Sequence, residues 1–439
     1  MIPKELIEID RKNILHGFVD PNEYRNSDYF QSHFFVRGDG CYLEDYNGRK
    51  WLDFRSNSGN VILGYNNKFL VNTIKNQAEK LCYTYSANVP RSLLTKNILK
   101  LIKNRDVKIM YTTSGSQAVE TAIKLCRNVT GKQKILSFRH GFHGSTYGAM
   151  NATGFSSMSN WFGSLIPGHI KLPSPYCYRC IFNENFPDCD YRCIDFIHKI
   201  ILDEDPDTIA GMIAEPIIRG YVIIPPPKYW ERLLKILHEY DIYLIFDEIA
   251  TGFYRTGKFF AYEHYLHSSK EIDVIILGKG LTSGYLPLSA TIFSNKITEI
   301  YENQFLMHDF TNHGDPLSCA VACETINLLN NTKLQKHILR VSSYLKDRLR
   351  ELQEKYSFIG DCRGIGLLFA IELVTDENNK APMPSDSVAN IVLRAFRQGV
   401  IIENLKNMLI LMPPAVVSFE DVDYVIDTLD KCFKNIGGV

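Results

Sequence analysis

The middle of the chain alternates short apolar runs with longer segments of helical periodicity, and this alternation restricts the fold more than any other feature. Strands are predicted at 108–111, 135–138, 212–214, 242–246 and 274–277, and helices at 121–129, 229–240 and 316–329. The segment Tyr243-Leu244-Ile245-Phe246 is apolar along its length, which is typical of a parallel strand buried on both faces. Strands that alternate with helices indicate βαβ units, so we predict an α/β fold around a mostly parallel sheet.

The two ends of the chain show a different pattern. Residues 34–45 and 49–54 flank an Asn47-Gly48 turn and are predicted to form an antiparallel hairpin. After about Ser318 the helical segments become longer, and the last one is predicted at 420–433. We therefore expect residues 66–317 to form a large domain, and residues 1–65 and 318–439 to combine into a smaller α+β domain.

The composition is that of an ordinary globular enzyme. Of the 439 residues, 45% are hydrophobic and 22% are charged, and the formal net charge is zero. A neutral chain lacks the bulk attraction to nucleic acid or to anionic membranes, so neither is expected as a partner. The N-terminal segment MIPKELIEIDRK has no apolar signal core, and no stretch approaches the length of a membrane span. We expect a cytoplasmic location.

Three polar residues directly follow three predicted strands: Glu215, Asp247 and Lys279. Ligands of open α/β sheets bind outside the carboxyl ends of the strands. An amine beside a carboxylate suits pyridoxal phosphate, because Lys279 can form a Schiff base with its aldehyde and Asp247 can keep its ring nitrogen protonated. Singly, each residue has a plainer interpretation: a lysine in a glycine loop is usually solvated, a strand-end aspartate is often a helix cap, and Glu215 can simply end a strand before Pro216.

A third element adds weight to this interpretation. Ser114, Gly115 and Ser116 follow a predicted strand and open a predicted helix. Glycine lets the backbone approach a phosphate, and a helix N-terminus offers free N–H groups together with a favourable dipole. The plainer alternative is a serine cap with Glu120 as its capping-box partner. An anion cradle, an aspartate and a lysine in this chain order together predict a pyridoxal-phosphate site.

Four stretches carry a closer resemblance: SGSQAVETAIKLCR, GFHGST, FDEIATGFYRTGKFFAYEH and ILGKGLTSGYLPLSA. They resemble the motifs of class III (omega-type) aminotransferases, which are pyridoxal-phosphate enzymes of fold type I, and the similarity runs from about Phe34 to the C-terminus. The resemblance implies a large domain with a mainly parallel seven-stranded sheet and a small α+β domain built from both termini. It also implies transfer of an amino group between an amine or amino-acid donor and a carbonyl acceptor.

The resemblance assigns roles to individual positions. It implies that Lys279 anchors the cofactor and that Asp247 pairs with the pyridine nitrogen. The remaining cofactor-binding positions that it implies are Ser114, Gly115 and Ser116 at the phosphate, Phe142 and Ile249 on the two ring faces, His143, and Glu215 near the ring hydroxyl. Thr311, within HDFTNHGDP, resembles the threonine that reaches the phosphate of a neighbouring subunit, which implies a homodimer. On plainer interpretations Phe142 is a core aromatic and Thr311 is a helix cap.

The departures from the family pattern concern the substrate. Relatives that bind carboxylates often use arginines, which pair with a carboxylate bidentately. Here Ser145 follows the FHG motif where one arginine often stands, and Glu403 lies about where the diaminopelargonate-forming enzymes carry another. We therefore expect an amine-rich or hydroxylated substrate, such as a diamine, an amino sugar or an amino alcohol. The cations left as candidates for a substrate carboxylate are Lys406, Arg55 and Arg219.

Two further possibilities stay open at this point. A racemase, epimerase or aminomutase would use the same cofactor and differ only in where the proton is returned. A binding protein without catalysis is disfavoured, because both Lys279 and Asp247 are present.

One cluster of cysteines stands apart from the other seven. Its spacing, C-x2-C followed by C-x3-C, is compatible with a tetrahedral zinc ion. Four reduced thiols in a surface excursion are the plainer interpretation and the favoured one. The residues concerned are Cys177, Cys180, Cys189 and Cys193.

Overall fold

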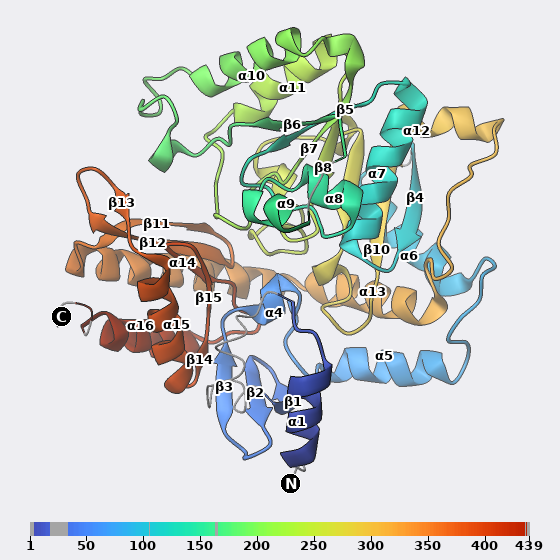
Figure 1. The fold of residues 1–439 in the computed structure, drawn as a ribbon. Coiled ribbons are helices and arrows are strands. Elements are labelled where there is room, and N and C mark those ends of the chain that lie inside the picture. Colours follow the sequence, from blue (N-terminus) through green and yellow to red (C-terminus); the bar gives the residue numbers. More distant parts are fainter. Residues whose placement is uncertain (1–3, 18–33, 105, 163–165, 435, 437–439) are drawn as a thin grey trace.

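The structure is a computed structural model that describes residues 4–17, 34–104, 106–162, 166–434 and 436 (Figure 1). Its largest sheet has seven strands in the order β4-β10-β9-β8-β7-β5-β6. These are β4 (Val107–Thr112), β5 (Lys134–Phe138), β6 (His169–Leu172), β7 (Ile209–Ala214), β8 (Tyr243–Asp247), β9 (Val274–Leu277) and β10 (Ser289–Ser294). Strands β6, β5, β7, β8 and β9 pair in parallel, whereas β10 is antiparallel to both neighbours. The predicted seven-stranded, mainly parallel sheet is confirmed.

Side chains of the central strands alternate between two apolar layers. Ile213 and Ile245 pack with helix α7 (Gly115–Thr130), whereas Met212 and Leu244 belong to the larger core on the opposite face. Successive strand residues point to opposite faces, so a strand covered on both sides has to be apolar throughout. The helices around the sheet are α8 (Tyr147–Ala152), α9 (Ser156–Phe162), α10 (Arg192–Asp203), α11 (Tyr229–Glu239) and α12 (Asn295–Thr298).

Helix α7 shows how local sequence sets the start and end of an element. The Ser114 side chain accepts a hydrogen bond from the Gln117 amide at 3.3 Å, and Gly131 ends the helix with φ at +69°. A serine N-cap and a left-handed glycine at the C-terminus satisfy backbone groups that would otherwise lack partners. The serine cap considered for Ser114 is therefore present, but Glu120 is not its capping-box partner, because the Glu120 carboxylate accepts hydrogen bonds from the Thr146 hydroxyl and the Gly148 amide. The helix is longer than the predicted segment 121–129 because it includes the whole first turn.

The termini form two smaller sheets (Figure 1). The first has the order β1 (Phe35–Asp39), β2 (Tyr42–Asp45), β3 (Lys50–Asp53) and β14 (Val400–Ile401). The second contains β11 (Ile359–Ile365), β12 (Leu368–Asp376), β16 (Met408–Leu411) and β15 (Glu403–Leu405), with β13 (Ala381–Pro382) paired to β12. The accompanying helices are α1 (Lys4–Asn13), α4 (Ser56–Gly59), α5 (Lys68–Ala78), α6 (Val89–Ile102), α13 (Pro316–Leu329), α14 (Thr332–Lys355), α15 (Ser385–Arg397) and α16 (Phe419–Lys434).

The pairing of β14 with β3 joins the two ends of the chain. Val400 lies opposite Leu52 in a parallel ladder, so the first and last parts share one sheet, as expected. The predicted hairpin is wrong in one respect. Its first strand, 34–45, is two strands, because Gly40 takes a φ of +54° and turns the chain between β1 and β2. The limits of the two domains stay a prediction. The predicted boundary between residues 317 and 318 falls inside α13.

None of the helices in the described part of the chain combines the length and the apolarity that crossing a bilayer requires.

Candidate active site

Three neighbouring strands end at one edge of the large sheet and bring three polar side chains together. Glu215 follows β7, Asp247 ends β8, and Lys279 follows β9 after Gly278. Glu215 and Asp247 are buried. Burial, with the charge of Arg219, lowers the pKa of Lys279 to about 8, although the nearby carboxylates oppose this change. The uncharged form of the Lys279 amine, which attacks a carbonyl, is therefore much more populated near neutral pH than in an ordinary lysine.

Asp247 is held in place from two sides. His143 Nδ1 lies 2.8 Å from Asp247 Oδ2, and the Ile249 amide donates to Asp247 Oδ1 at 3.0 Å. The His143 amide in turn donates to Thr153 Oγ1 at 2.9 Å. A carboxylate acceptor places the proton of the imidazole on Nδ1. His143 therefore lies behind the aspartate and orients it.

Glu215 joins two loops of the site. Its carboxylate accepts hydrogen bonds from the Phe142 amide at 3.1 Å and from the Arg219 amide at 3.0 Å. Burial raises the pKa of Glu215 to about 7, and the charge of Asp247 adds to this. Glu215 thus holds together the backbone of the loop at Phe142 and the backbone at Arg219, next to the ends of the strands.

The turn that precedes α7 lies close to Ile249. A Cβ atom on Gly115 would lie 2.9 Å from Ile249 Cδ1, and one on Gly278 would lie 3.2 Å from Ile249 Cγ2. Ser116 Oγ accepts a hydrogen bond from the Ser145 amide at 3.1 Å, which ties the 141–146 loop to the start of α7. A side chain at Gly115 would push the end of the Ile249 side chain, and one at Gly278 would crowd both Ser289 Oγ and Ile249, so glycine leaves room for Ile249 at both positions.

These residues fit pyridoxal phosphate. The first turn of α7, which carries Gly115 and Ser116, is suited to a phosphate. Lys279 offers an amine of lowered pKa, and the buried carboxylate of Asp247 lies at the end of the adjacent strand, β8. Phe142 and Ile249 supply an aromatic and an aliphatic side chain beside these groups.

Glu403, at the position where relatives carry a carboxylate-binding arginine, forms an ion pair. Arg219 Nη1 and Nη2 lie 3.0 and 2.6 Å from the two carboxylate oxygens of Glu403, which is on β15. Arg55 Nε lies 3.5 Å from the same carboxylate. Burial opposes ionisation of Glu403, but the charges of Arg219 and Arg55 hold its pKa below the ordinary value. Arg219 is therefore already engaged bidentately inside the protein.

The other expected substrate and cofactor residues lie farther out. Ser145 is exposed, and its described contact is through its backbone amide. Lys406 lies over the Tyr221 ring, 5.9 Å from the centroid. Thr311 is exposed, and its carbonyl oxygen accepts a hydrogen bond from the Tyr83 hydroxyl at 2.6 Å. The structure thus groups Arg55 and Glu403 with Lys279 but does not group Ser145, Lys406 or Thr311 with it.

Two aromatic residues that the sequence analysis did not single out extend the site. Phe155 packs on Phe142 with the ring centroids 5.9 Å apart, and Tyr221 packs on Phe155 at the same separation. Phe155 follows α8, and Tyr221 follows the Glu215 loop. No local pattern marks them, because their proximity depends on how two distant loops fold over the sheet.

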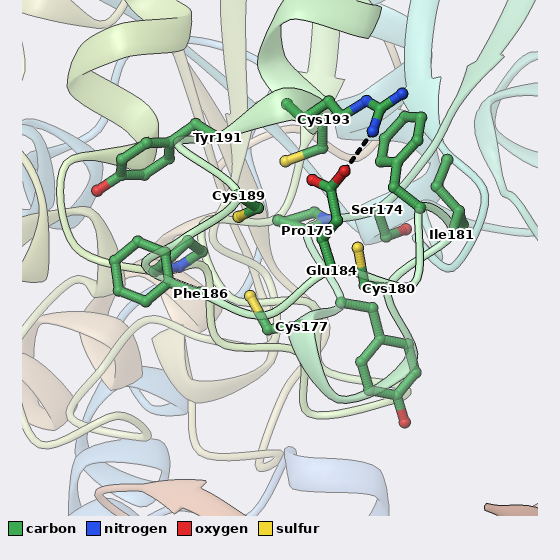
Figure 2. Close-up of a pocket in the computed structure, with 14 residues that line it drawn as sticks. Ser174, Pro175, Cys177, Cys180, Ile181, Glu184, Phe186, Cys189, Tyr191 and Cys193 are labelled. Atoms are coloured by element: carbon green, nitrogen blue, oxygen red, sulfur yellow. Dashed lines mark hydrogen bonds and ion pairs between the residues drawn. The ribbon is translucent and has the colours of Figure 1, made fainter. Parts of the chain in front are cut away.

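The four clustered thiols surround one small cavity (Figure 2). They lie in and around the 3-10 helix η1 (Cys177–Arg179), in the loop that follows it and at the start of α10, and these positions do not produce the zinc arrangement that their spacing allows. Within the described ranges, no three side chains of histidine, cysteine, aspartate or glutamate form a group that could hold a metal ion. Burial raises the pKa of Cys193 to about 12, and all four cysteines are free thiols. The residues are Cys177, Cys180, Cys189 and Cys193.

Residues 24–433 match the family described as Aminotransferase class-III. The chain is 33% identical to the adenosylmethionine-8-amino-7-oxononanoate aminotransferase of Staphylococcus aureus, over 99% of this chain and 98% of that protein. It is 32% identical to the leucine/methionine racemase of Thermococcus litoralis, over 91% and 90% of the two chains. An amine transaminase structure from an uncultivated Pseudomonas species, in its PLP-bound form, superposes with a TM-score of 0.91 at 29% identity, covering 97% of this chain and 99% of that one.

Proposed function

This chain belongs to the class III family of pyridoxal-phosphate-dependent aminotransferases, and we propose that its substrate site selects an amine-bearing or hydroxylated group in preference to a second carboxylate. The family, the fold class, the cofactor and the reaction class predicted from the sequence are confirmed. The identity of the substrate, the roles of individual site residues and the assembly stay proposals.

The chemistry follows from the residues at the strand ends. Bound pyridoxal phosphate supplies a protonated ring that accepts the electron pair left when a proton leaves the substrate carbon. The amine of Lys279 removes that proton and returns it, and burial lowers its pKa to about 8, so more of it is in the basic, uncharged form than for an ordinary lysine. Asp247, oriented by His143, keeps a negative charge where the ring nitrogen needs one. The start of α7 binds the phosphate, and Phe142 and Ile249 enclose the ring.

The bidentate Arg219–Glu403 pair is the observation that supports the substrate preference. Binding a substrate carboxylate at the Glu403 position would need an arginine, whereas Glu403 is itself a carboxylate. Glu403 also accepts hydrogen bonds from Nη1 and Nη2 of Arg219, so these two groups are already used. A substrate ammonium or hydroxyl group can bind a carboxylate oxygen of Glu403, whereas a substrate carboxylate is repelled. The half-exposed Arg55 is left to bind the carboxylate of a donor such as glutamate or alanine.

Replacing Glu403 with glutamine tests this preference. We expect kcat/KM for diamine or amino-alcohol donors to fall about 10-fold, because a charge-assisted hydrogen bond is lost. Activity with simple α-amino acids should rise, since Arg219 is released. The matched control is Glu302→Gln, which removes an exposed carboxylate paired with Lys108. The proposal is wrong if the unmodified enzyme prefers simple α-amino acids in both half-reactions.

We further propose a homodimer in which Thr311 reaches the phosphate site of the partner subunit. Large apolar side chains are exposed near the Thr311 segment and near Tyr83, which suits contact with a second copy of the chain. They include Tyr85, Val89, Leu93, Phe305 and Met307, all at least 49% exposed. A cytoplasmic location stays a prediction from the sequence.

Sedimentation of the purified protein should give twice the mass of the chain. Thr311→Ala should raise the dissociation constant of the cofactor about 10-fold, because one hydrogen bond to a charged phosphate is lost. Ser145→Ala serves as the control, since the described contact of Ser145 uses its backbone. A monomer with full activity would contradict the proposed assembly.

A racemase or mutase is the second candidate function, and the resemblance to the leucine/methionine racemase supports it. The two reactions differ when one amine is supplied alone. Transfer leaves the cofactor in its amine form with one equivalent of carbonyl product, whereas racemisation leaves it unchanged and inverts the substrate.

A further inference from the structure

A second cleft lies outside the site described above, where the central sheet region meets the sheet that contains β12, β15 and β16. It has about 450 Å³ of free volume, which is in the range of small-molecule sites. One wall carries Tyr176, Arg179 and Tyr221, and the facing wall carries Glu372, Met383 and Lys406. The two walls come from parts of the chain about 200 residues apart in sequence, so a ligand held between them would join the two regions.

Aromatic rings separate this cleft from the cofactor region. Tyr221 lines the cleft and packs on Phe155, and Phe155 packs on Phe142, with 5.9 Å between the ring centroids at each step. Lys406, which the sequence analysis considered for the substrate, lies on the cleft side of Tyr221. The cleft is therefore a neighbour of the active site rather than part of it.

The carboxylates beside the cleft already have counterions. Glu372 pairs with both Arg179 and Arg363, and Arg363 also pairs with Asp361 at 2.7 Å. Two guanidinium groups thus face two carboxylates, and these four charges balance. His140, which also lines the cleft, has its pKa lowered to about 4 by burial and by the charge of Lys406, so it is uncharged at neutral pH.

Lys406 is the charge that remains. Within the described part of the chain its ammonium makes a contact with the Tyr221 ring but neither an ion pair nor a hydrogen bond. Lys406 and Asn407 form the two-residue turn between β15 and β16, and Lys406 takes a φ of +53°, where glycine or asparagine is less strained. This turn places the exposed ammonium of Lys406 at the mouth of the cleft, 5.9 Å from the centroid of the Tyr221 ring.

The start of helix α15 adds to the positive potential. Pro384 and Ser385 line the cleft, and no side chain caps the helix. The first N–H groups of a helix and its dipole favour an anion at this end. Asp386 lies in the first turn and is exposed, as Pro384, Ser385 and Lys406 are, but it is not among the residues that line the cleft. An anion in the cleft would therefore meet Lys406 from one side and the α15 terminus from another.

We propose that this cleft binds a small organic carboxylate with an aromatic or branched apolar body. The carboxylate lies between Lys406 and the start of α15, and the apolar body packs against Tyr221, Tyr176 and Met383. Because both walls contact the ligand, binding holds the two regions together. It also restrains Tyr221, whose neighbour Phe155 supports Phe142.

Phenylacetate is a suitable probe, because it has neither an amine nor a carbonyl that the enzyme could transfer. Binding is measured by titration calorimetry on the holoenzyme after aminooxyacetate has blocked the cofactor aldehyde. We expect one phenylacetate per chain, and binding of the neutral isostere phenylacetamide at least about 10-fold weaker, because the charge-assisted contact is missing.

Variants of Lys406 complete the test. Lys406→Gly suits the turn and should weaken phenylacetate binding about 10-fold, whereas Lys406→Arg should retain it. Lys103→Gly is the matched control, since it removes another lysine at a positive φ, +52°, at the exposed end of α6. The proposal is overturned if phenylacetate does not bind, if phenylacetamide binds equally well, or if Lys406→Gly and Lys103→Gly bind alike. None of these outcomes depends on turnover, so they are separate from a failure of the proposed substrate preference.

Discussion

Replacing Lys279 with alanine is expected to lower turnover by about 10³-fold or more, because the group that moves the substrate proton is removed. The visible absorbance of the lysine-bound cofactor should disappear as well. Lys279 lies just after β9, near the buried carboxylates of Glu215 and Asp247, and burial lowers its pKa to about 8 although these carboxylates oppose the change. Steady-state kinetics and an absorbance spectrum of the purified variant measure both effects.

A second buried lysine provides the control. Burial lowers the pKa of Lys171 to about 7, and its ammonium donates hydrogen bonds to Ser137 Oγ at 2.9 Å and to the carbonyl oxygen of Asn151. It lies on β6, at the opposite edge of the sheet from β4. Lys171→Met should reduce thermal stability but keep the visible absorbance. If Lys279→Ala kept the activity of the unmodified enzyme, the central assignment would be wrong.

The second large effect concerns Asp247. We expect Asp247→Asn to slow the chemical step about 10²- to 10³-fold, because an amide cannot hold the cofactor ring nitrogen protonated. The cofactor should still bind, although more weakly, because Lys279 and the α7 turn are unchanged. Single-turnover kinetics with a saturating amine separate the chemical step from binding.

Glu215→Gln is the matched control for Asp247→Asn. Both carboxylates are buried at adjacent strand ends, but burial raises the pKa of Glu215 to about 7, so part of it is uncharged at neutral pH. Its two carboxylate oxygens each accept a hydrogen bond from one backbone amide, that of Phe142 or that of Arg219, so glutamine keeps one of these hydrogen bonds through its carbonyl oxygen and loses the other. We expect a much smaller loss of rate. Equal losses in the two variants would argue against a special role for the charge of Asp247.

Features that depend on local sequence were predictable. Strand β9 was predicted with the bounds that it has, and helix α13 likewise, because an apolar run or a capped helical period is written in consecutive residues. The first β-strand was predicted too long, since nothing in its alternation shows that Gly40 turns the chain. Zinc ligation was compatible with the cysteine spacing, but spacing alone does not orient thiols toward a common point.

Pairings between distant residues were not predictable. His143 and Asp247 are 104 positions apart, and Arg219 and Glu403 are 184 apart. All four residues are candidates on sequence grounds, but no local pattern links Arg219 with Glu403. Because of this pairing, Arg219 is not free to bind a substrate carboxylate; its guanidinium group already binds Glu403.

The sequence alone located five of the seven strands of the large sheet and the polar residues that follow them, because hydrophobic periodicity and strand-end chemistry are local properties; it missed β6 and β10 and gave no order of the strands. The tertiary structure alone decided which charges meet: Glu403 with Arg219 beside Lys279, and Lys406 without a counterion above Tyr221. The physical reason is that an ion pair depends on distances across the fold, which are set when β15 and β16 pack against the loops of the central sheet.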